Sequence, residues 1–332
     1  MTPADYRQLV EHYRAYKQRG VQLVLVTVVE TIGSTYRKAG AHMLISDEGA
    51  SHGLVSGGCL EGNLLMHAQK VLQTGKATLV EYDLMNEDEG PWGLSIGCNG
   101  IVRLVLQQVD PADSNNLIER LVQVAEGDQP AWLAVCAEGD IGQWCLIAES
   151  ENLPVAGLGQ NAGMQEATDG SRWMVQKLKP LPSILVVGAG PDVPPLLQQM
   201  HRQGWRVTVA DHRPAYLQRM AGQPTEHANL VKVGQLAKRL ELDQFDAAIL
   251  MSHHLEADRT GLADLLGSTV PYIGMLGPRA RAQQLLENLG AEPLDQQPRV
   301  HAPVGLDLGG EGAEAIALSI VAQLQNFLSK SR

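Results

Sequence analysis

The stretch that most constrains the fold is "ILVVGAGPDVPPLLQQMHRQGWRVTVAD", residues 184–211. An apolar, β-branched run precedes Gly188 and Gly190, a helix-forming run follows them, and a second apolar strand ends in Asp211. In such a unit the first glycine permits a tight turn and the second lets a phosphate approach the backbone. Asp211 stands where an acid binds the ribose of a dinucleotide. The pattern predicts a parallel, Rossmann-like sheet.

The turn departs from the dinucleotide-binding fingerprint at two positions. Val193 replaces the third glycine, and Pro191 removes a backbone N–H group that could hold a phosphate. The N-terminus of the following helix still favours an anion, through its free N–H groups and its dipole. Two interpretations stay open: the domain binds a nucleotide or NAD(P), or it binds another phosphorylated ligand or a partner.

Strand and helix patterns alternate through the rest of the second half, which is typical of a doubly wound sheet. Polar residues follow several predicted strands: His253 after "DAAIL", Arg279 after "PYIGMLG", and His301 and Asp307 within "RVHAPVGLDLGG". Because ligands bind at the carboxyl ends of parallel strands, we expect these side chains to line a site for an anionic ligand with polar ring edges. A structural role for each histidine is the alternative.

The first half of the chain has a less regular pattern. Thr2, Pro3 and Asp5 mark the start of a helix. A Pro-containing boundary, "KPLPS", separates an expected mixed α+β domain, residues 1–178, from an expected Rossmann-like domain, residues 181–332. Within the first domain we predict strands at 21–30, 41–46, 51–56, about 77–83 and about 101–107, two strands within 132–148, helices at 60–75 and 112–126, and loops at 150–172.

Charge and composition narrow the class of protein. The net charge of −11 disfavours nucleic acid as a partner, since phosphate-binding domains are usually basic. No apolar run reaches bilayer length and the first residues lack a signal-peptide core, so we expect a cytoplasmic protein. The four cysteines include no C-x-x-C pair, and neither a zinc knuckle nor a disulfide is expected.

Two of the cysteines lie beside glycine, Cys59 in "SGGCLEG" and Cys98 in "IGCNG". Cys59 precedes a predicted helix, whose dipole favours a thiolate, and Gly57 and Gly58 leave room for a bulky ligand. A thiolate is a soft ligand that suits a thiophilic metal. Simple packing in a turn is the alternative for both thiols, and for Cys98 neither interpretation is preferred.

Segments from both halves resemble the XdhC/CoxI family. The resemblance lies in "GSTYRKAGAHMLIS", "GLVSGGCLEGNL" and "GCNGIVRLVL", and then in the glycine-turn unit, "SHHLEADRTGL", "PYIGMLGPRAR" and "RVHAPVGLDLG". It implies a factor that binds molybdenum cofactor, supports its sulfuration with a cysteine desulfurase, and inserts it into a xanthine or aldehyde dehydrogenase-type apoenzyme. It also implies that Cys59 contacts the molybdenum, and we expect a homodimer.

With a pterin phosphate as ligand, Arg37 and Lys38 become candidate phosphate contacts, although a solvated turn would explain them as well. The resemblance favours an accessory chaperone over a stand-alone enzyme. Two alternatives remain: an NAD(P)-dependent oxidoreductase with a reactive Cys59, and a nucleotidyltransferase acting on the cofactor. No proton-shuttling group can be assigned for the first, and no G-x-x-x-x-G-K loop is present for the second.

Overall fold

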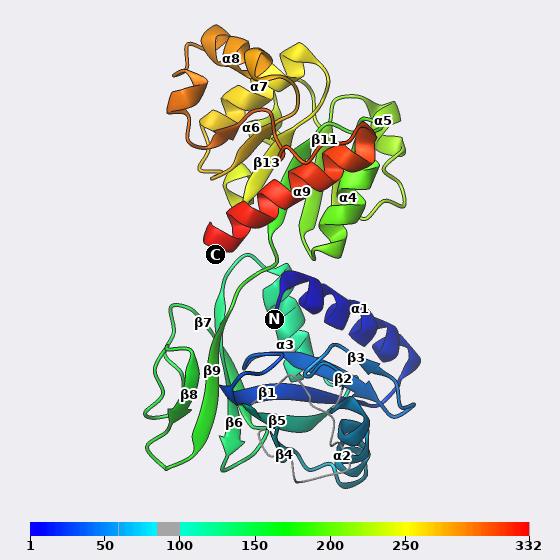
Figure 1. Cartoon of the computed structure of the whole chain (residues 1–332), viewed down its shortest axis with the longest axis vertical. Coiled ribbons are helices and arrows are strands. Elements are labelled where there is room, and N and C mark those ends of the chain that lie inside the picture. The colour runs from blue at the N-terminus through cyan, green and yellow to red at the C-terminus, as the bar shows by residue number, and fades with distance from the viewer. Residues whose placement is uncertain (59, 85–99, 332) are drawn as a thin grey trace. The chain divides into compact units, whose positions relative to one another are not determined.

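The computed structural model describes residues 1–58, 60–84 and 100–331 (Figure 1). The chain divides into two compact units, Met1–Pro180 and Leu181–Arg332. Among the described helices, none combines the length and the apolar character that a bilayer span requires.

In its described residues, unit 1 contains two antiparallel sheets and three helices. The strand order is β3-β2-β1-β5-β4 in the larger sheet and β7-β6-β9-β8 in the smaller one. The elements are α1 (Pro3–Arg19), β1 (Leu23–Gly33), β2 (His42–Ser46), β3 (Ser51–His52), α2 (Glu61–Thr74), β4 (Thr78–Asp83), β5 (Gly100–Val109), α3 (Leu117–Glu126), β6 (Ala131–Glu138), β7 (Trp144–Ala148), β8 (Gly163–Glu166) and β9 (Arg172–Leu178).

Strand alternation decides how unit 1 packs. Along β1, Val24, Val26 and Val28 face α2, while Leu23 and Leu25 face α1, α3 and the smaller sheet. Both sets are buried, so the larger sheet is covered on its two faces by different layers (Figure 1). The sequence around Thr2 forms the expected capping box at α1, which confirms the predicted helix start.

Unit 2 is a parallel sheet with the strand order β12-β11-β10-β13-β14-β15. In chain order within the unit this is 3-2-1-4-5-6, so the strand order reverses between β10 and β13. The elements are β10 (Ser183–Val187), α4 (Val193–Arg202), β11 (Arg206–Asp211), α5 (Pro214–Gln218), β12 (His227–Leu230), α6 (Leu236–Arg239), η1 (Leu242–Gln244), β13 (Ala247–Leu250), α7 (Leu255–Leu266), β14 (Ile273–Met275), α8 (Arg279–Asn288), η2 (Leu294–Gln296), β15 (Val300–His301) and α9 (Gly312–Ser331).

Both faces of this sheet are buried. Ile184 and Val186 of β10 pack on the side of α4 and α9, which lie side by side in Figure 1. Leu185 and Val187 pack on the opposite side, against α6, α7 and α8. The doubly wound, Rossmann-like architecture expected from the sequence is therefore confirmed.

Several element predictions were wrong in detail. Helix α3 begins at Leu117 instead of residue 112, because the Asn116 side chain accepts the N–H group of Glu119 and caps the helix there. Strand β8 lies inside the segment predicted as loops, and β9, β12 and β15 have no counterpart in the prediction. Only Ser51–His52 of the predicted strand 51–56 pairs with a neighbour.

Candidate functional site

The glycine pair of unit 1 lies between β3 and α2. Gly58 has a φ of +105°, which other residues rarely adopt, and among the described residues other than its chain neighbours, no heavy atom lies within 4 Å of the position that a Cβ would take there. Gly57 is exposed beside the ring of Tyr36. Cys59 and Cys98 lie outside the described residues, so the expectations for these two thiols stay predictions.

Ser56 and Glu61 hold this turn against the start of α2. The Glu61 carboxylate accepts the hydroxyl of Ser56 at 2.6 Å, the N–H group of Ser56 at 3.2 Å and the N–H group of Leu60 at 3.1 Å. The Ser56 hydroxyl oxygen in turn accepts the N–H groups of Gly58 and Leu60. These contacts tie the start of α2 to the backbone that leads into and out of the glycine pair.

Arg37 and Lys38 differ in their availability to a ligand. Arg37 forms an ion pair with Asp5, at 2.7 Å, and its Nε donates to the carbonyl of Leu54 at 3.1 Å. Burial opposes ionisation of Asp5, but hydrogen bonds from Arg37 and Thr2 outweigh it and lower the pKa of Asp5. Lys38 is exposed. A phosphate could reach Lys38 directly, whereas Arg37 would first have to leave Asp5.

In unit 2, Gly188, Gly190, Asp211 and His253 lie together at the adjoining carboxyl ends of β10, β11 and β13. Gly188 has a φ of +130°, and a Cβ there would collide with the Met251 carbonyl at the end of β13. A Cβ on Gly190 would lie 2.7 Å from Oδ1 of Asp192 and 3.4 Å from the His253 ring. Gly188 is therefore required by its φ and by the Met251 carbonyl, whereas a Cβ on Gly190 would only have to displace the end of the Asp192 side chain.

The Asp211 carboxylate is completely buried and accepts four donors. Oδ1 accepts the N–H group and Nε of Arg213, at 2.8 and 2.9 Å, and Oδ2 accepts the N–H group of Ala189 and Nη2 of Arg213, both at 2.7 Å. Burial opposes ionisation, but these hydrogen bonds outweigh it and lower the pKa of Asp211. The acid that the sequence predicts to bind a ribose is thus bonded to the turn and to Arg213 in this structure, and binding of NAD(P) stays a prediction.

His253 combines backbone strain with a carboxylate partner. Its φ of +56° is unusual for a residue other than glycine, and its side chain is 53% exposed. Nε2 lies 2.9 Å from Oδ2 of Asp192, a residue only 9% exposed. Within the described chain, Oδ1 of Asp192 has no hydrogen-bond partner. Strain of this kind often accompanies function.

The other three expected site residues of unit 2 are Arg279, His301 and Asp307. The first two contact other residues, and the third is exposed. Arg279 forms an ion pair with Asp295 of η2, and His301 stacks on Tyr272 with ring centroids 4.1 Å apart. Burial lowers the pKa of His301. Asp307 is exposed in the segment between β15 and α9. The structure thus brings four of the expected residues of unit 2 together, and these three lie apart from them.

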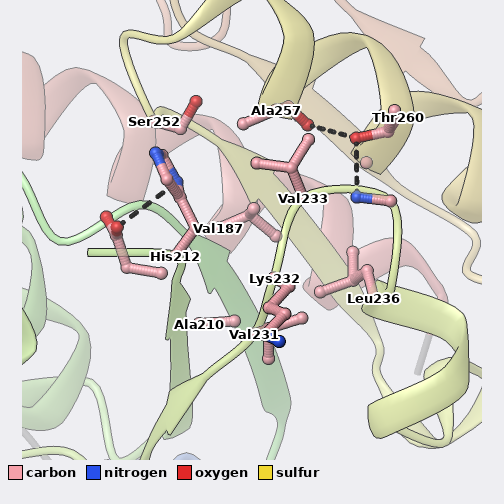
Figure 2. Close-up of a pocket in the computed structure, with 13 residues that line it drawn as sticks. Val187, Ala210, His212, Val231, Lys232, Val233, Leu236, Ser252, Ala257 and Thr260 are labelled. Carbon is pink, nitrogen blue, oxygen red and sulfur yellow. Dashed lines mark hydrogen bonds and ion pairs between the residues drawn. The ribbon is translucent and has the colours of Figure 1, made fainter. Parts of the chain in front are cut away.

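A small pocket of about 30 Å³ opens beside Asp211, and sequence reasoning missed most of its lining (Figure 2). Its walls come from the ends of β10, β11 and β12 and from α7. The prediction missed this lining because it missed strand β12, whose sequence "HANL" is too polar to indicate a strand. The lining residues are Val187, Ala210, Asp211, His212, Val231, Lys232, Val233, Gly234, Leu236, Ser252, Ala257, Thr260 and Gly261. In the described part of the chain, no cluster of three His, Cys, Asp or Glu side chains could hold a metal ion.

The chain is similar to known proteins over most of its length. It is 29% identical over 318 residues to a probable xanthine dehydrogenase subunit of Bacillus subtilis (strain 168), covering 91% of this chain and 92% of that protein. It is 22% identical over 329 residues to the "Molybdenum cofactor insertion chaperone PaoD" of Escherichia coli (strain K12), covering 96% of this chain and 88% of PaoD.

A crystal structure described as a xanthine dehydrogenase from Bacillus halodurans has the same fold. The TM-score is 0.79 at 28% identity, with 100% of this chain and 97% of that chain covered. The family profile described as "XdhC and CoxI family" matches residues 17–83, and the profile described as "XdhC Rossmann domain" matches residues 184–324. With one profile in each unit and relatives similar along nearly its full length, the chain belongs to the XdhC and CoxI family.

Proposed function

We propose that this protein is a molybdenum cofactor insertion chaperone, which binds the cofactor and delivers it to an apoenzyme of the xanthine or aldehyde dehydrogenase type. The observation that carries the proposal is the similarity to PaoD over 96% of the chain, together with the similarity to one xanthine dehydrogenase component. The proposal includes a cysteine desulfurase as the partner that supplies sulfur, and a homodimer as the working form.

The turn at Gly57 and Gly58 is the proposed place of the cofactor. No side chain of the described residues beyond its chain neighbours covers Gly58, which supports this role because a bulky ligand needs uncovered backbone. Cys59 follows directly in the sequence and would offer a soft thiolate ligand to the molybdenum. Cys98 would be a second thiol at the same site.

The phosphate of the cofactor needs a cation, and the loop before β2 offers two. The exposed Lys38 would make the first contact. Arg37 would add a second only by exchanging its ion pair with Asp5 for one with the phosphate, since its guanidinium is already bonded. We therefore expect Lys38 to contribute more to cofactor binding than Arg37.

The test is to purify the protein from cells that make molybdenum cofactor, and to measure bound molybdenum by mass spectrometry and bound pterin by fluorescence after oxidation. Stoichiometric metal and pterin are expected for the parent protein. A parent protein that carries neither, and that does not activate a cofactor-free dehydrogenase when supplied with cofactor, contradicts the proposed function.

The residue roles need matched variants. Cys59→Ala should lose most of the bound cofactor, whereas Cys145→Ala, which removes a half-buried thiol from β7 of the same unit, should retain it. Lys38→Gln should weaken binding, with Lys70→Gln on the exposed side of α2 as its control. A Cys59→Ala variant with a full cofactor load would exclude Cys59 as the ligand while leaving the chaperone function intact.

A further inference from the structure

Tyr36, in the loop between β1 and β2, differs from the other aromatic residues that the structure describes. It is 57% exposed, whereas every other described Tyr, Trp or Phe residue is buried or half-buried. With its ring largely in water, Tyr36 forgoes most of the apolar burial by which an aromatic side chain stabilises a fold. Packing within the fold therefore does not account for an aromatic residue at this position.

The ring of Tyr36 lies beside the glycine pair of unit 1. A Cβ on Gly57 would lie 3.9 Å from Cδ2 of Tyr36, and among the described residues other than its chain neighbours no other heavy atom lies within 4 Å of that position. Gly57 is exposed and, unlike Gly58, does not have a positive φ. The ring and the uncovered backbone of Gly57 are therefore adjoining parts of one surface, at the proposed place of the cofactor.

Hydrogen bonds hold the backbone next to Tyr36. The hydroxyl of Thr35 donates to the carbonyl of Arg37 at 2.8 Å. The side chain of Arg37 is bonded in turn to the carbonyl of Leu54, at 3.1 Å, and to the carboxylate of Asp5, at 2.7 Å. The loop thus presents the ring in a defined place, which reduces the conformational entropy that is lost when a ligand binds.

From these observations we propose that Tyr36 stacks on the pterin of the molybdenum cofactor and thereby selects a flat ring at this turn. The pyrimidine part of a pterin is flat and conjugated, and such rings stack favourably on aromatic side chains. The exposed Lys38, two residues further on, offers a cation to the phosphate from the same loop. This inference rests on the proposed function, and it gives the pterin a contact that does not involve the molybdenum.

Metal-free molybdopterin tests this contact, because its binding includes no bond between molybdenum and a thiolate. Equilibrium dialysis against the full chain gives the affinity, with the pterin measured by fluorescence after oxidation. Tyr36→Leu keeps an apolar side chain but removes the ring, and should weaken binding about tenfold, which is the size of a typical stacking contribution. Tyr36→Phe keeps the ring and should bind within about twofold of the parent protein.

Gly57→Leu locates the contact. The new side chain would lie against the Tyr36 ring and cover it, so binding of metal-free molybdopterin should weaken. In combination with Tyr36→Leu it should weaken binding little further, because both substitutions remove the same contact. The thermal unfolding midpoints of the variants should match that of the parent protein, since both positions are exposed.

The cofactor load of the purified parent protein separates a failure of this inference from a failure of the proposed function. If the parent protein carries the cofactor, equal affinity of metal-free molybdopterin for the parent protein and for Tyr36→Leu overturns the role of Tyr36 alone. Failure of metal-free molybdopterin to bind that same parent protein also overturns it. A parent protein that neither carries the cofactor nor binds molybdopterin contradicts both proposals.

Discussion

Arg213 grips both oxygens of the Asp211 carboxylate, through Nε at 2.9 Å and Nη2 at 2.7 Å. The Asp211 carboxylate also accepts the N–H group of Ala189, which follows β10. The Asp211 side chain therefore connects the carboxyl ends of β10 and β11. Asp211→Asn should lower the free energy of unfolding of unit 2 by about 2 kcal/mol, because a buried charge-assisted contact is lost. Denaturant unfolding followed at Trp205 measures the effect.

The matched control for this prediction is Glu256→Gln, which breaks the exposed pair with Arg259 on α7. Exposed pairs contribute little to stability because solvent screens them, so the control should be nearly neutral. A double-mutant cycle with Arg213→Gln should give a coupling energy of about 1 kcal/mol or more between Asp211 and Arg213. A cycle with no coupling would show that the ion pair does not contribute to stability.

His42 should make unit 1 sensitive to acid. Burial, together with the nearby N-terminal amine, lowers the pKa of His42 to about 3. An unfolded histidine titrates near 6.5, so below that pH the unfolded state binds a proton that the folded state does not. The free energy of unfolding should therefore fall by about 1.4 kcal/mol per pH unit between roughly pH 6 and pH 4, and this contribution is absent above pH 6.5.

Hydrogen exchange of the β1 and β2 amides at several pH values measures the expected decrease in the free energy of unfolding of unit 1, which contains His42. His42→Asn, which preserves a polar group near Thr27, should have a shallower pH dependence by about one proton. His227→Asn removes an exposed histidine from β12 and should leave the slope unchanged. Equal slopes in the parent protein and His42→Asn would refute the prediction.

Glu61 should stabilise the start of α2 and the turn before it. Glu61→Ala removes three hydrogen bonds, from the Ser56 hydroxyl and from the N–H groups of Ser56 and Leu60. Loss of a hydrogen bond typically costs about 1 kcal/mol, so exchange of the Ser56 and Leu60 amides should accelerate about fivefold. Gln69→Ala, on the exposed side of the same helix, should not change those amides.

Glu30 should stabilise unit 1 by joining its two sheets. Glu30 lies on β1 of the larger sheet. Its carboxylate accepts a hydrogen bond from Nη1 of Arg103, in the same sheet, at 2.9 Å. It accepts another from Nη2 of Arg172, in the smaller sheet, at 3.0 Å. Glu138 accepts the same two arginines, so the four charges form a network. Glu30→Gln should lower the free energy of unfolding of unit 1 by about 2 kcal/mol, more than an isolated surface pair would.

The comparison for Glu30 is Glu149→Gln, which breaks the single ion pair with Lys177 in the smaller sheet. A single exposed pair should contribute less than about 1 kcal/mol. Thermal unfolding of both variants at low and at high salt separates the two cases. Equal destabilisation by the two substitutions would mean that the network adds nothing beyond its individual pairs.

The architecture of unit 2 was predictable because each inner strand is a short apolar run bounded by turn residues, as in "ILVVGAG". The strands β12 and β15 were not predictable in this way. They have only a few residues, and β12 is mostly exposed, so hydrophobic alternation gives no signal. The same reason hid the pocket, because Lys232, Val233 and Gly234 follow the strand that was missed.

For Gly188, Gly190 and Asp211 of unit 2, the sequence predicted the position in the fold but not the contacts. The glycines and Asp211 fall where the pattern placed them, at the carboxyl ends of β10 and β11. Nothing in the residue order indicates that Asp211 bonds to Arg213 and Ala189, since this depends on rotamers and on the path of the turn. Backbone topology follows from apolar periodicity, whereas the partner of each polar side chain is decided by three-dimensional packing.

The carboxylate over Gly190 makes Asp192 a tethered competitor for the space that the glycine opens. Because it is covalently attached, it is present at an effective concentration in at least the millimolar range, whatever the level of free ligand. A diphosphate would have to displace it and also break its contact with His253. We therefore expect the Asp192 carboxylate to disfavour a diphosphate at this glycine turn, and Asp192→Ala should remove that part of the barrier.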